Sequence, residues 1–357
     1  MKRHKILLLV TFLVGMLVSC NDEPQLQNPI AEKEYDMTGF AKGADVSWIT
    51  EMENSGVEFY DTTGTKTECM HLMRDMGMNS IRLRVWVDPD DGWCNEDDLL
   101  IKAWRANNLG MRLMIDFHYS DSWADPGQQN KPSAWEGLSL DAMTDSLYNY
   151  TVSVLQTLKD NNITPEWVQI GNETTGGMLW DNDEAISGAL TANNGANYVK
   201  LHNAGYDAAK SVFPDTKVVL HIDRGQQLDI SKRVLTYIVP NNVKLDILGL
   251  SIYPDPDNWE EYTKSCIENM QWIVDNYGYK VMICETGMSH DQATIAKKFL
   301  SKLITQTQTI VDSKGNQMGT GVFYWEPEAY NSWNNYTKGA FNNDGTPTKA
   351  LDAFLEN

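Results

Sequence analysis

The sequence predicts an α/β protein folded as a single (β/α)8 barrel, the TIM barrel, and three observations support this fold class. Short apolar runs alternate with longer helix-like stretches along the chain, which is the rhythm of a parallel sheet. Several runs are apolar on both faces, as strands buried between a core and a helix layer are. Neither a GxGxxG turn nor a P-loop follows the first strand, which disfavours an open nucleotide-binding sheet.

The eight predicted strands span residues 40–48, 80–87, 112–120, 167–173, 217–223, 245–254, 280–287 and 319–326. The predicted helices between them include residues 67–77, 96–108, 142–161, 194–213 and 258–277. Gly77, Gly110 and Gly278 stand where a helix would stop before the next strand. Eight such units close into a barrel more readily than they form an open sheet.

Residues 1–20 are predicted to be a lipoprotein signal peptide. Basic residues precede an apolar run over residues 6–18, which is shorter than the about 20 residues that a membrane-spanning helix needs. The run ends in Leu17-Val18-Ser19-Cys20, which resembles a bacterial lipobox with Cys20 as the lipidated first residue of the mature protein. An ordinary signal peptide that ends near a cysteine is the alternative.

This leader predicts an exported protein that touches a membrane only through its lipid anchor. The acidic residues that follow Cys20 resemble the surface-export signal of Bacteroidetes lipoproteins, so the outer membrane and cell surface of a Gram-negative bacterium are expected. Residues 21–38 read as a flexible tether because they carry prolines and polar residues without apolar periodicity. Residues 39–357 are long enough for one elaborated catalytic barrel, which we expect to be a monomer.

The charge of the chain restricts its partners. The net charge is −20, and removal of the three basic residues of the leader leaves 26 Lys plus Arg against 49 Asp plus Glu, or −23. Such a surface repels nucleic acid and polyanionic substrates, so a neutral substrate fits best. The 12 tryptophans and 15 tyrosines suit stacking on sugar rings in addition to core packing.

Four cysteines besides Cys20 carry no metal signature. Cys69, Cys94, Cys266 and Cys284 form no CxxC motif and no Cys/His spacing typical of a metal site, so neither a metal nor a cofactor is expected. Cys284 lies in an apolar strand and is expected in the core. An oxidising compartment would permit one disulfide, but the sequence does not pair the cysteines.

Polar and aromatic residues stand at the carboxyl ends of seven predicted strands, and a barrel opens all of these ends onto one face. They are Trp86, His118, Glu173, His221, Tyr253, Glu285 and Trp325. Glu173 and Glu285 each follow an apolar run directly. Retaining hydrolysis of a glycosidic bond needs two carboxyl groups about 5–5.5 Å apart, one protonated and one ionised, which opposing strand ends can supply.

Four segments resemble the arabinogalactan endo-β-1,4-galactanases of glycoside hydrolase family 53, and the resemblance runs from about residue 40 to the C-terminus. The segments are GADVS at 43–47, IRLRVW at 81–86, DFHYSDSWADPG at 116–127 and YWEP at 324–327. The Gly-Asn-Glu at 171–173 and the Glu-Thr-Gly at 285–287 also fall where that family has them.

The resemblance implies an endo-acting, retaining hydrolase of galactan and type I arabinogalactan. It implies that Glu173 is the acid/base, that Glu285 is the nucleophile, and that Asn172 binds the sugar 2-hydroxyl. Arg82 would keep Glu285 ionised, and Tyr253 would donate a hydrogen bond to it. The residues expected around the sugar are Arg82, Trp86, His118, Tyr119, Ser120, Asp121, Trp123, Asn172, His221, Asp223, Tyr253 and Trp325.

Some neighbours of these residues have other interpretations. Arg84 shares the side of Arg82 on its strand, and either a site role or a structural ion pair inside the barrel fits it. Glu326 and Glu328 are expected to be supporting or solvated residues and not catalytic ones. Some relatives hold a structural calcium in an insertion after strand seven, but the short loop at 288–291 does not support that ion here.

Two rival functions remain. Another retaining barrel glycosidase, such as a β-1,4-mannanase or a xylanase, would use the same two glutamates. A non-catalytic glycan-binding lipoprotein is the rival from a different class. The loops that build outer subsites depart from the family pattern, so the size of the products stays open.

Overall fold

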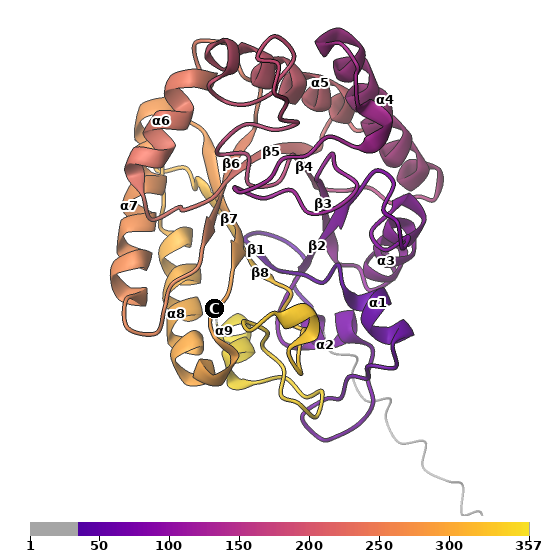
Figure 1. Ribbon diagram of the computed structural model, residues 1–357. Coiled ribbons are helices and arrows are strands. Elements are labelled where there is room, and N and C mark those ends of the chain that lie inside the picture. Colours follow the sequence, from indigo (N-terminus) through magenta and orange to yellow (C-terminus); the bar gives the residue numbers. More distant parts are fainter. Residues whose placement is uncertain (1–34, 357) are drawn as a thin grey trace, which may run out of the picture. The chain divides into compact units, whose positions relative to one another are not determined.

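A computed structural model describes residues 35–356 of the chain. Their eight strands form one closed parallel barrel in sequence order, with helices around it (Figure 1). This confirms the predicted (β/α)8 fold. The predicted leader with Cys20, and residues 21–34 of the predicted tether, lie outside the described residues.

Each strand pairs in parallel with the next, and the last pairs with the first. The strands are β1 (Ala41–Asp45), β2 (Ser80–Val85), β3 (Arg112–Phe117), β4 (Trp167–Ile170), β5 (Lys217–Ile222), β6 (Ile247–Ile252), β7 (Lys280–Thr286) and β8 (Gly319–Trp325). β3 and β4 end three residues before their predicted limits, because there the chain leaves the ladder to place polar side chains on the barrel face.

The helices cover the outside of this barrel (Figure 1). They are α1 (Ile49–Asn54), α2 (Cys69–Asp75), α3 (Glu96–Asn108), α4 (Leu140–Asp160), α5 (Ala196–Val212), α6 (Leu228–Ile238), α7 (Trp259–Tyr277), α8 (Ala293–Gln308) and α9 (Asp352–Leu355). Their ends follow capping chemistry. The Asn95 side chain accepts a hydrogen bond from the Asp98 amide at the start of α3. Gly278 ends α7 with a φ of 70° that favours glycine.

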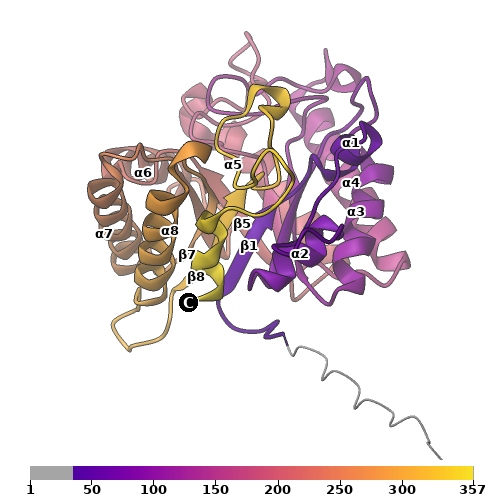
Figure 2. The same cartoon turned by 90° about the horizontal axis from the view of Figure 1, so that it is seen from below.

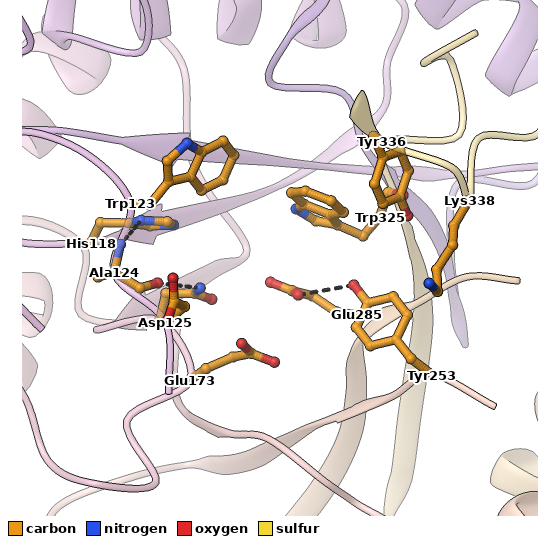
Figure 3. A pocket seen from close by; sticks show the side chains of 11 residues that line it. His118, Trp123, Ala124, Asp125, Glu173, Tyr253, Glu285, Trp325, Tyr336 and Lys338 are labelled. Carbon is orange, nitrogen blue, oxygen red and sulfur yellow. Dashed lines mark hydrogen bonds between the residues drawn. The ribbon is translucent and has the colours of Figure 1, made fainter. Parts of the chain in front are cut away.

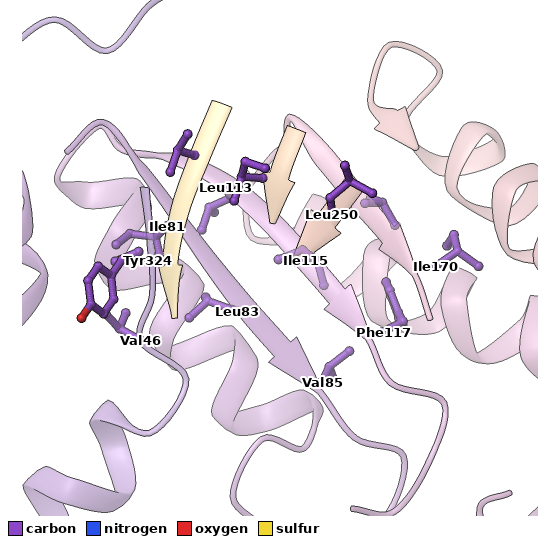
Figure 4. Packing of buried hydrophobic residues seen from close by; sticks show 14 of the residues in the cluster. Val46, Ile81, Leu83, Val85, Leu113, Ile115, Phe117, Ile170, Leu250 and Tyr324 are labelled. Atoms are coloured by element: carbon purple, nitrogen blue, oxygen red, sulfur yellow. The ribbon is translucent and has the colours of Figure 1, made fainter. Parts of the chain in front are cut away.

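Alternating residues of the strands face the barrel interior and the helix layer. On β2, Ile81, Leu83 and Val85 pack outward into the large apolar cluster under the helices (Figure 4), whereas Arg82 and Arg84 point inward. The inner cluster is small and consists of Ala41, Met114, Trp167, Val219, Ile247, Met282, Cys284 and Phe323. Polar side chains therefore fill the part of the interior near the carboxyl ends of the strands.

A bulge in β7 sets the direction of Glu285. Leu250 of β6 pairs with Ile283, but the next residue, Ser251, pairs with Glu285, so Cys284 is an extra residue in the ladder. In a regular strand Glu285 would face the helices, because Cys284 already packs inside the barrel. The bulge lets both side chains point inward.

Seen from the side, the connection after β8 lies at the end of the barrel opposite to the point where the chain enters β1 (Figure 2). This connection, residues 326–348, therefore covers part of the face on which the strands end. Within residues 35–356 no helix is long and apolar enough to cross a membrane. Cys69, Cys94, Cys266 and Cys284 are all buried and free, so the described part of the chain contains no disulfide between them.

Candidate active site

A cavity of about 440 Å³, here called the central cavity, opens at the carboxyl ends of the strands (Figure 3). Glu173 and Glu285 face each other across it (Figure 3). Its lining residues are His118, Trp123, Ala124, Asp125, Asn172, Glu173, Tyr253, Glu285, Trp325, Tyr336 and Lys338. The structure thus brings together two carboxyl groups that are 112 positions apart in the sequence.

Glu285 is held by one cation and one hydroxyl. Its Oε1 lies 2.9 Å from Nη1 of Arg82, and its Oε2 accepts a hydrogen bond of 3.1 Å from the Tyr253 hydroxyl. The residue is only 5% exposed. Both contacts favour the charged carboxylate and fix its orientation.

Arg82 makes four side-chain hydrogen bonds in addition to its ion pair with Glu285. Nε donates to Gln169 at 3.1 Å and Nη2 donates to Asp116 at 2.8 Å and to Asn172 at 2.9 Å. Nη1 donates to Asp45 at 2.7 Å and forms the ion pair with Glu285. A planar guanidinium held in this way cannot rotate without breaking several of these bonds, so it is a rigid support for Glu285.

The two carboxyl groups both have pKa values above the usual range of a glutamate, and burial is the largest cause for each. Burial raises the pKa of Glu285, and the charges of Asp116 and Asp45 add to this, while Arg82 opposes them. Burial also raises the pKa of Glu173, and the negative charge of Glu285 raises it well above the usual range. Because Arg82 lies beside Glu285, Glu285 loses its proton at a lower pH than Glu173 does. The pair can therefore hold one proton on Glu173 and one negative charge on Glu285.

The backbone around Glu173 is unusual. Gly171 and Glu173 adopt φ values of 80° and 46°, and a Cβ at Gly171 would lie 2.5 Å from Thr174. A positive φ at a glutamate is sparsely populated and costs on the order of 1–3 kcal/mol, which local structure must hold in place. The turn projects Glu173 into the cavity at the point where β4 has ended.

The hydrogen-bond partners of the His118 ring indicate which of its nitrogens carries a proton. Its Nδ1 accepts from the Trp86 indole at 3.1 Å and from the Ala124 amide at 3.2 Å. Nε2 therefore carries the proton and donates to Asp116 at 3.1 Å. The His118 ring therefore connects Asp116, which pairs with Arg82, to the indole of Trp86.

His221 lies beneath Glu173 and does not line the cavity. Its Nδ1 accepts from the Glu173 amide at 3.3 Å, and its Nε2 lies 2.8 Å from the Ser251 hydroxyl. Burial and the charge of Arg82 lower the pKa of this ring well below its usual range, so it is neutral. It positions the turn that carries Glu173.

Asn172 combines a fixed orientation with access to the cavity. Its Oδ1 accepts from Arg82, and its Nδ2 donates to the Ala124 carbonyl at 2.9 Å. The second hydrogen of Nδ2 is left for a ligand, which is the geometry needed to bind a sugar hydroxyl.

Aromatic rings form one wall of the site. Trp123 and Trp325 line the central cavity with ring centroids 5.8 Å apart, and Tyr336 packs edge-on against Trp325 at 4.8 Å. Trp86 lies behind Trp123 at 5.2 Å and faces a neighbouring cavity. Such surfaces suit the apolar faces of sugar rings.

Three residues of the segment after β3 do not line the central cavity, which corrects the expectation that they surround the sugar. Tyr119 is fully buried, its ring stacks on Phe117, and its hydroxyl lies 2.8 Å from Thr151. Ser120 is also buried. Asp121 accepts hydrogen bonds from the amides of Asp88 and Ser133 and so joins two loops. The alternation of inward and outward side chains along β3 could not predict where these side chains point, because the strand ends at residue 117.

Other expected positions also differ. Asp223 does not line the central cavity but ion-pairs with Arg224 at 2.6 Å, although its charge still raises the pKa of Glu173. Glu326 and Glu328 are completely buried, which excludes the solvated position allowed by the sequence. Glu326 pairs with Arg84, so the structural ion pair considered for this arginine is present.

Several residues at the site carried no role in the sequence analysis. Asp45, Asp116 and Gln169 hold Arg82, and their inward positions at strand ends were the available signal. Tyr336 and Lys338 come from the connection after β8 and line the cavity. No local pattern could place them there, because that connection folds back through tertiary contacts such as the bond of the Tyr336 hydroxyl to the Trp325 carbonyl at 3.0 Å.

The structure offers little to a metal ion. Between residues 35 and 356, no three His, Cys, Asp or Glu side chains cluster in a way that could hold one. The loop between β7 and α8 is limited to residues 287–292. The absence of a cofactor stays a prediction.

Comparison with known proteins places nearly the whole barrel in one family of glycoside hydrolases. The family model described as glycosyl hydrolase family 53 matches residues 41–354. An endo-beta-1,4-galactanase of Bacillus subtilis (strain 168) is 31% identical over 313 residues, which cover 81% of this chain and 70% of the relative. Arabinogalactan endo-beta-1,4-galactanase A of Aspergillus niger is 32% identical over 313 residues, which cover 80% of this chain and 84% of the relative.

A solved structure shares the same fold. A chain from a study of two fungal beta-1,4-galactanases superposes with a TM-score of 0.80 at 26% identity. The match covers 90% of this chain and 100% of the fungal chain.

Proposed function

Because this chain belongs to glycosyl hydrolase family 53, we propose that it hydrolyses internal β-1,4-galactosidic bonds of galactan and type I arabinogalactan with retention of configuration. The observation that carries the proposal is the pair of carboxyl groups that face each other across the central cavity in opposite environments. The printed names of the relatives, which are galactanases, support the choice of substrate.

In the first step Glu173 donates its proton to the glycosidic oxygen, and the carboxylate of Glu285 attacks the anomeric carbon. The bond to the leaving sugar breaks, and a glycosyl ester forms on Glu285. Arg82 and Tyr253 hold the attacking carboxylate in place. Asn172 donates to the sugar 2-hydroxyl, a bond that strengthens as the ring gains positive charge.

In the second step the same groups exchange roles. Formation of the ester removes the charge of Glu285, so the pKa of Glu173 falls and its carboxylate can accept a proton from water. The water oxygen attacks the anomeric carbon and Glu285 leaves as a carboxylate. Two inversions at one carbon give net retention.

Digestion of potato galactan, mannan and xylan with separation of the products tests this function against its rivals. We expect a ladder of short galacto-oligosaccharides from galactan and no new reducing ends from the other two polymers. Release from mannan or xylan but not galactan would establish a mannanase or xylanase. Binding of galactan without release of reducing ends would establish a glycan-binding protein.

We also propose that the barrel is held at the outer membrane by a lipid on Cys20 and acts at the cell surface. The support is the basic and apolar leader that ends in the lipobox-like sequence, together with the acidic residues after it. We propose a monomer that works without a metal or another cofactor. Its mechanism needs only side chains that the barrel itself supplies.

A further inference from the structure

Two loops meet beside Glu173. Residues 124–131 belong to the connection between β3 and α4, and residues 171–181 belong to the connection between β4 and α5. Glu173 stands on the second loop with a φ of 46°, which a glutamate holds only where its neighbours fix the backbone. The contacts that fix it therefore decide whether its carboxyl group points across the central cavity at Glu285 (Figure 3).

The peptide unit between Asn172 and Glu173 is held on both sides. Its N–H, which belongs to Glu173, donates to Nδ1 of His221 at 3.3 Å. Its C=O, which belongs to Asn172, accepts a hydrogen bond of 2.8 Å from Nε2 of Gln129 on the first loop. Because a peptide unit is planar, rotating it would change ψ of Asn172 and φ of Glu173 together and would swing the Glu173 side chain. The two hydrogen bonds oppose that rotation.

The orientation of the Gln129 amide follows from its partners. Nε2 donates to the Asp125 carbonyl at 3.2 Å as well as to the Asn172 carbonyl, and both of these oxygens can only accept. The nitrogen must therefore face them, and both of its hydrogens are used. Gln129 is 2% exposed, so water does not readily replace these bonds when the amide is removed.

A second contact holds Gln129 itself against the loop that carries Glu173. The Gln129 carbonyl accepts a hydrogen bond of 2.8 Å from the Trp180 amide. Two residues further along, Lys131 forms an ion pair with Asp181. The Lys131 side chain is 1% exposed, and Asp181 is the carboxylate that pairs with it within residues 35–356. Separating this pair would leave a buried charge without its partner, so the pair keeps the two loops together.

We propose that Gln129 is a positioning residue for the acid/base: its bond to the Asn172 carbonyl fixes the peptide unit that directs Glu173 at Glu285, and the Lys131–Asp181 pair keeps Gln129 in place. This inference rests on the proposed function and adds a residue to it. Gln129 does not line the central cavity, so it acts through Glu173 and not on the sugar.

The effect should be confined to Glu173. The side chain of Asn172, which faces the sugar, is held separately by Arg82 and by the Ala124 carbonyl. Glu285 is held by Arg82 and Tyr253 and has no contact with either loop that depends on Gln129. Loss of the Gln129 bond should therefore weaken proton donation and leave the nucleophile intact.

Two substrates distinguish this role from a general loss of structure. Cleavage of galactan needs the proton of Glu173, whereas the leaving group of 2,4-dinitrophenyl β-1,4-galactobioside departs without one. Gln129→Met keeps the length of the side chain and removes both donors. We expect its kcat/KM to fall at least about tenfold on galactan, which corresponds to about 1.4 kcal/mol, and to change less than about twofold on the dinitrophenyl glycoside.

Gln271→Met is the matched control. Nε2 of Gln271 also donates to a backbone carbonyl, that of Val311 at 2.9 Å, but the residue lies on α7 and does not line the central cavity. This control should leave both kcat/KM values unchanged. In a folded Gln129→Met protein, as judged by circular dichroism and urea unfolding, an unchanged value on galactan or an equal loss on both substrates would overturn the inference. Wild-type protein that releases no sugar from galactan would instead overturn the proposed function.

Lys131→Met provides a second variant, which decides the question if Gln129→Met does not fold. It removes the ion pair with Asp181 but keeps an apolar chain of similar length in the buried position. A loss of kcat/KM on galactan alone supports the inference, and equal losses on both substrates, or none, overturn it.

The pH profile is a further readout that a merely structural role would not move. Glu173 faces the charges of Glu285, Asp223 and Arg82, and burial followed by the charge of Glu285 raises its pKa. A released peptide unit lets Glu173 approach water and leave Glu285, so its pKa falls. In Gln129→Met the basic limb of kcat/KM on galactan should therefore move to lower pH while the acidic limb stays. A basic limb that does not move would overturn the inference.

Discussion

At the scale of single residues, the charge balance of the site depends on one arginine that pairs with several carboxylates. Arg82 contacts three buried carboxylates, those of Asp45, Asp116 and Glu285, so the group as a whole keeps excess negative charge. This excess raises the pKa of Glu285 above that of an isolated ion pair, and the charge of Glu285 in turn raises the pKa of Glu173. The pair therefore titrates as a unit.

Removal of either glutamate should have a different chemical consequence. Glu285→Ala should abolish turnover of every substrate, because no glycosyl ester can form. Glu173→Ala should retain activity on aryl galactosides whose leaving groups need no proton, and azide should restore its rate. Steady-state kinetics on activated and natural substrates measure both effects. The exposed Glu184, replaced by alanine, is the control, and identical behaviour of the two site variants would contradict the assigned roles.

The pH dependence follows from the same pair. Activity requires ionised Glu285, so it appears as pH rises through the pKa of Glu285, and it requires protonated Glu173, so it is lost above the pKa of Glu173. Both pKa values are raised, so the bell in kcat/KM should lie above the usual range of carboxyl groups.

Arg82→Met should move the acidic limb of this bell upward, since the charge of Arg82 lowers the pKa of Glu285 more than the hydrogen bond from Tyr253 does. The rate should fall as well. Arg112→Met is a matched control, because Arg112 begins β3 at the far end of the barrel and pairs with Glu166. A folded Arg82→Met protein with an unmoved acidic limb would exclude the role given to Arg82.

At the scale of elements, the sequence predicted the type and order of strands and helices because those depend on local patterns. It did not predict the bulge at Cys284, since a bulge is a property of the pairing between β6 and β7. Nor could it place Tyr336 and Lys338, which reach the cavity from a connection whose path depends on tertiary contacts. The approach of Glu173 to Glu285 was predictable, because both stand at strand ends that open onto one face of a barrel.

The hydrogen bond between Tyr119 and Thr151 joins the segment after β3 to α4. The Thr151 hydroxyl donates to the Leu147 carbonyl, so the Tyr119 hydroxyl donates to Thr151 at 2.8 Å. Tyr119→Phe should lower the free energy of unfolding by about 1 kcal/mol and leave kcat and KM on galactan unchanged. Urea unfolding and galactan kinetics measure the two quantities, with Thr151→Val completing a double-mutant cycle. A large rise in KM at unchanged stability would restore the substrate-binding role.

At the scale of the whole molecule, charge and architecture agree with a neutral polymer as substrate. The net charge of −20 disfavours nucleic acid and acidic glycans. The barrel supports the site, and Glu173 and Glu285, the two proposed catalytic residues, stand at or just beyond strand ends.

Cys20→Ser should release the protein from the membrane fraction without changing its activity, because the proposed lipid lies outside the barrel. The several acyl chains of a mature lipoprotein anchor stably, whereas one chain binds only marginally. Fractionation and globomycin sensitivity measure the anchor, and Ser19→Ala, which keeps the cysteine, is the control. Finding the unmutated protein entirely in the soluble fraction would contradict the lipobox.

The anomeric configuration of the first product tests the central claim most directly. Proton NMR of a β-1,4-galactan digest follows the α and β anomeric signals of newly formed reducing ends before mutarotation equilibrates them. Retention through an ester on Glu285 predicts that the β signal appears first and the α signal grows later. Early appearance of the α signal would show inversion and contradict a double displacement by Glu173 and Glu285.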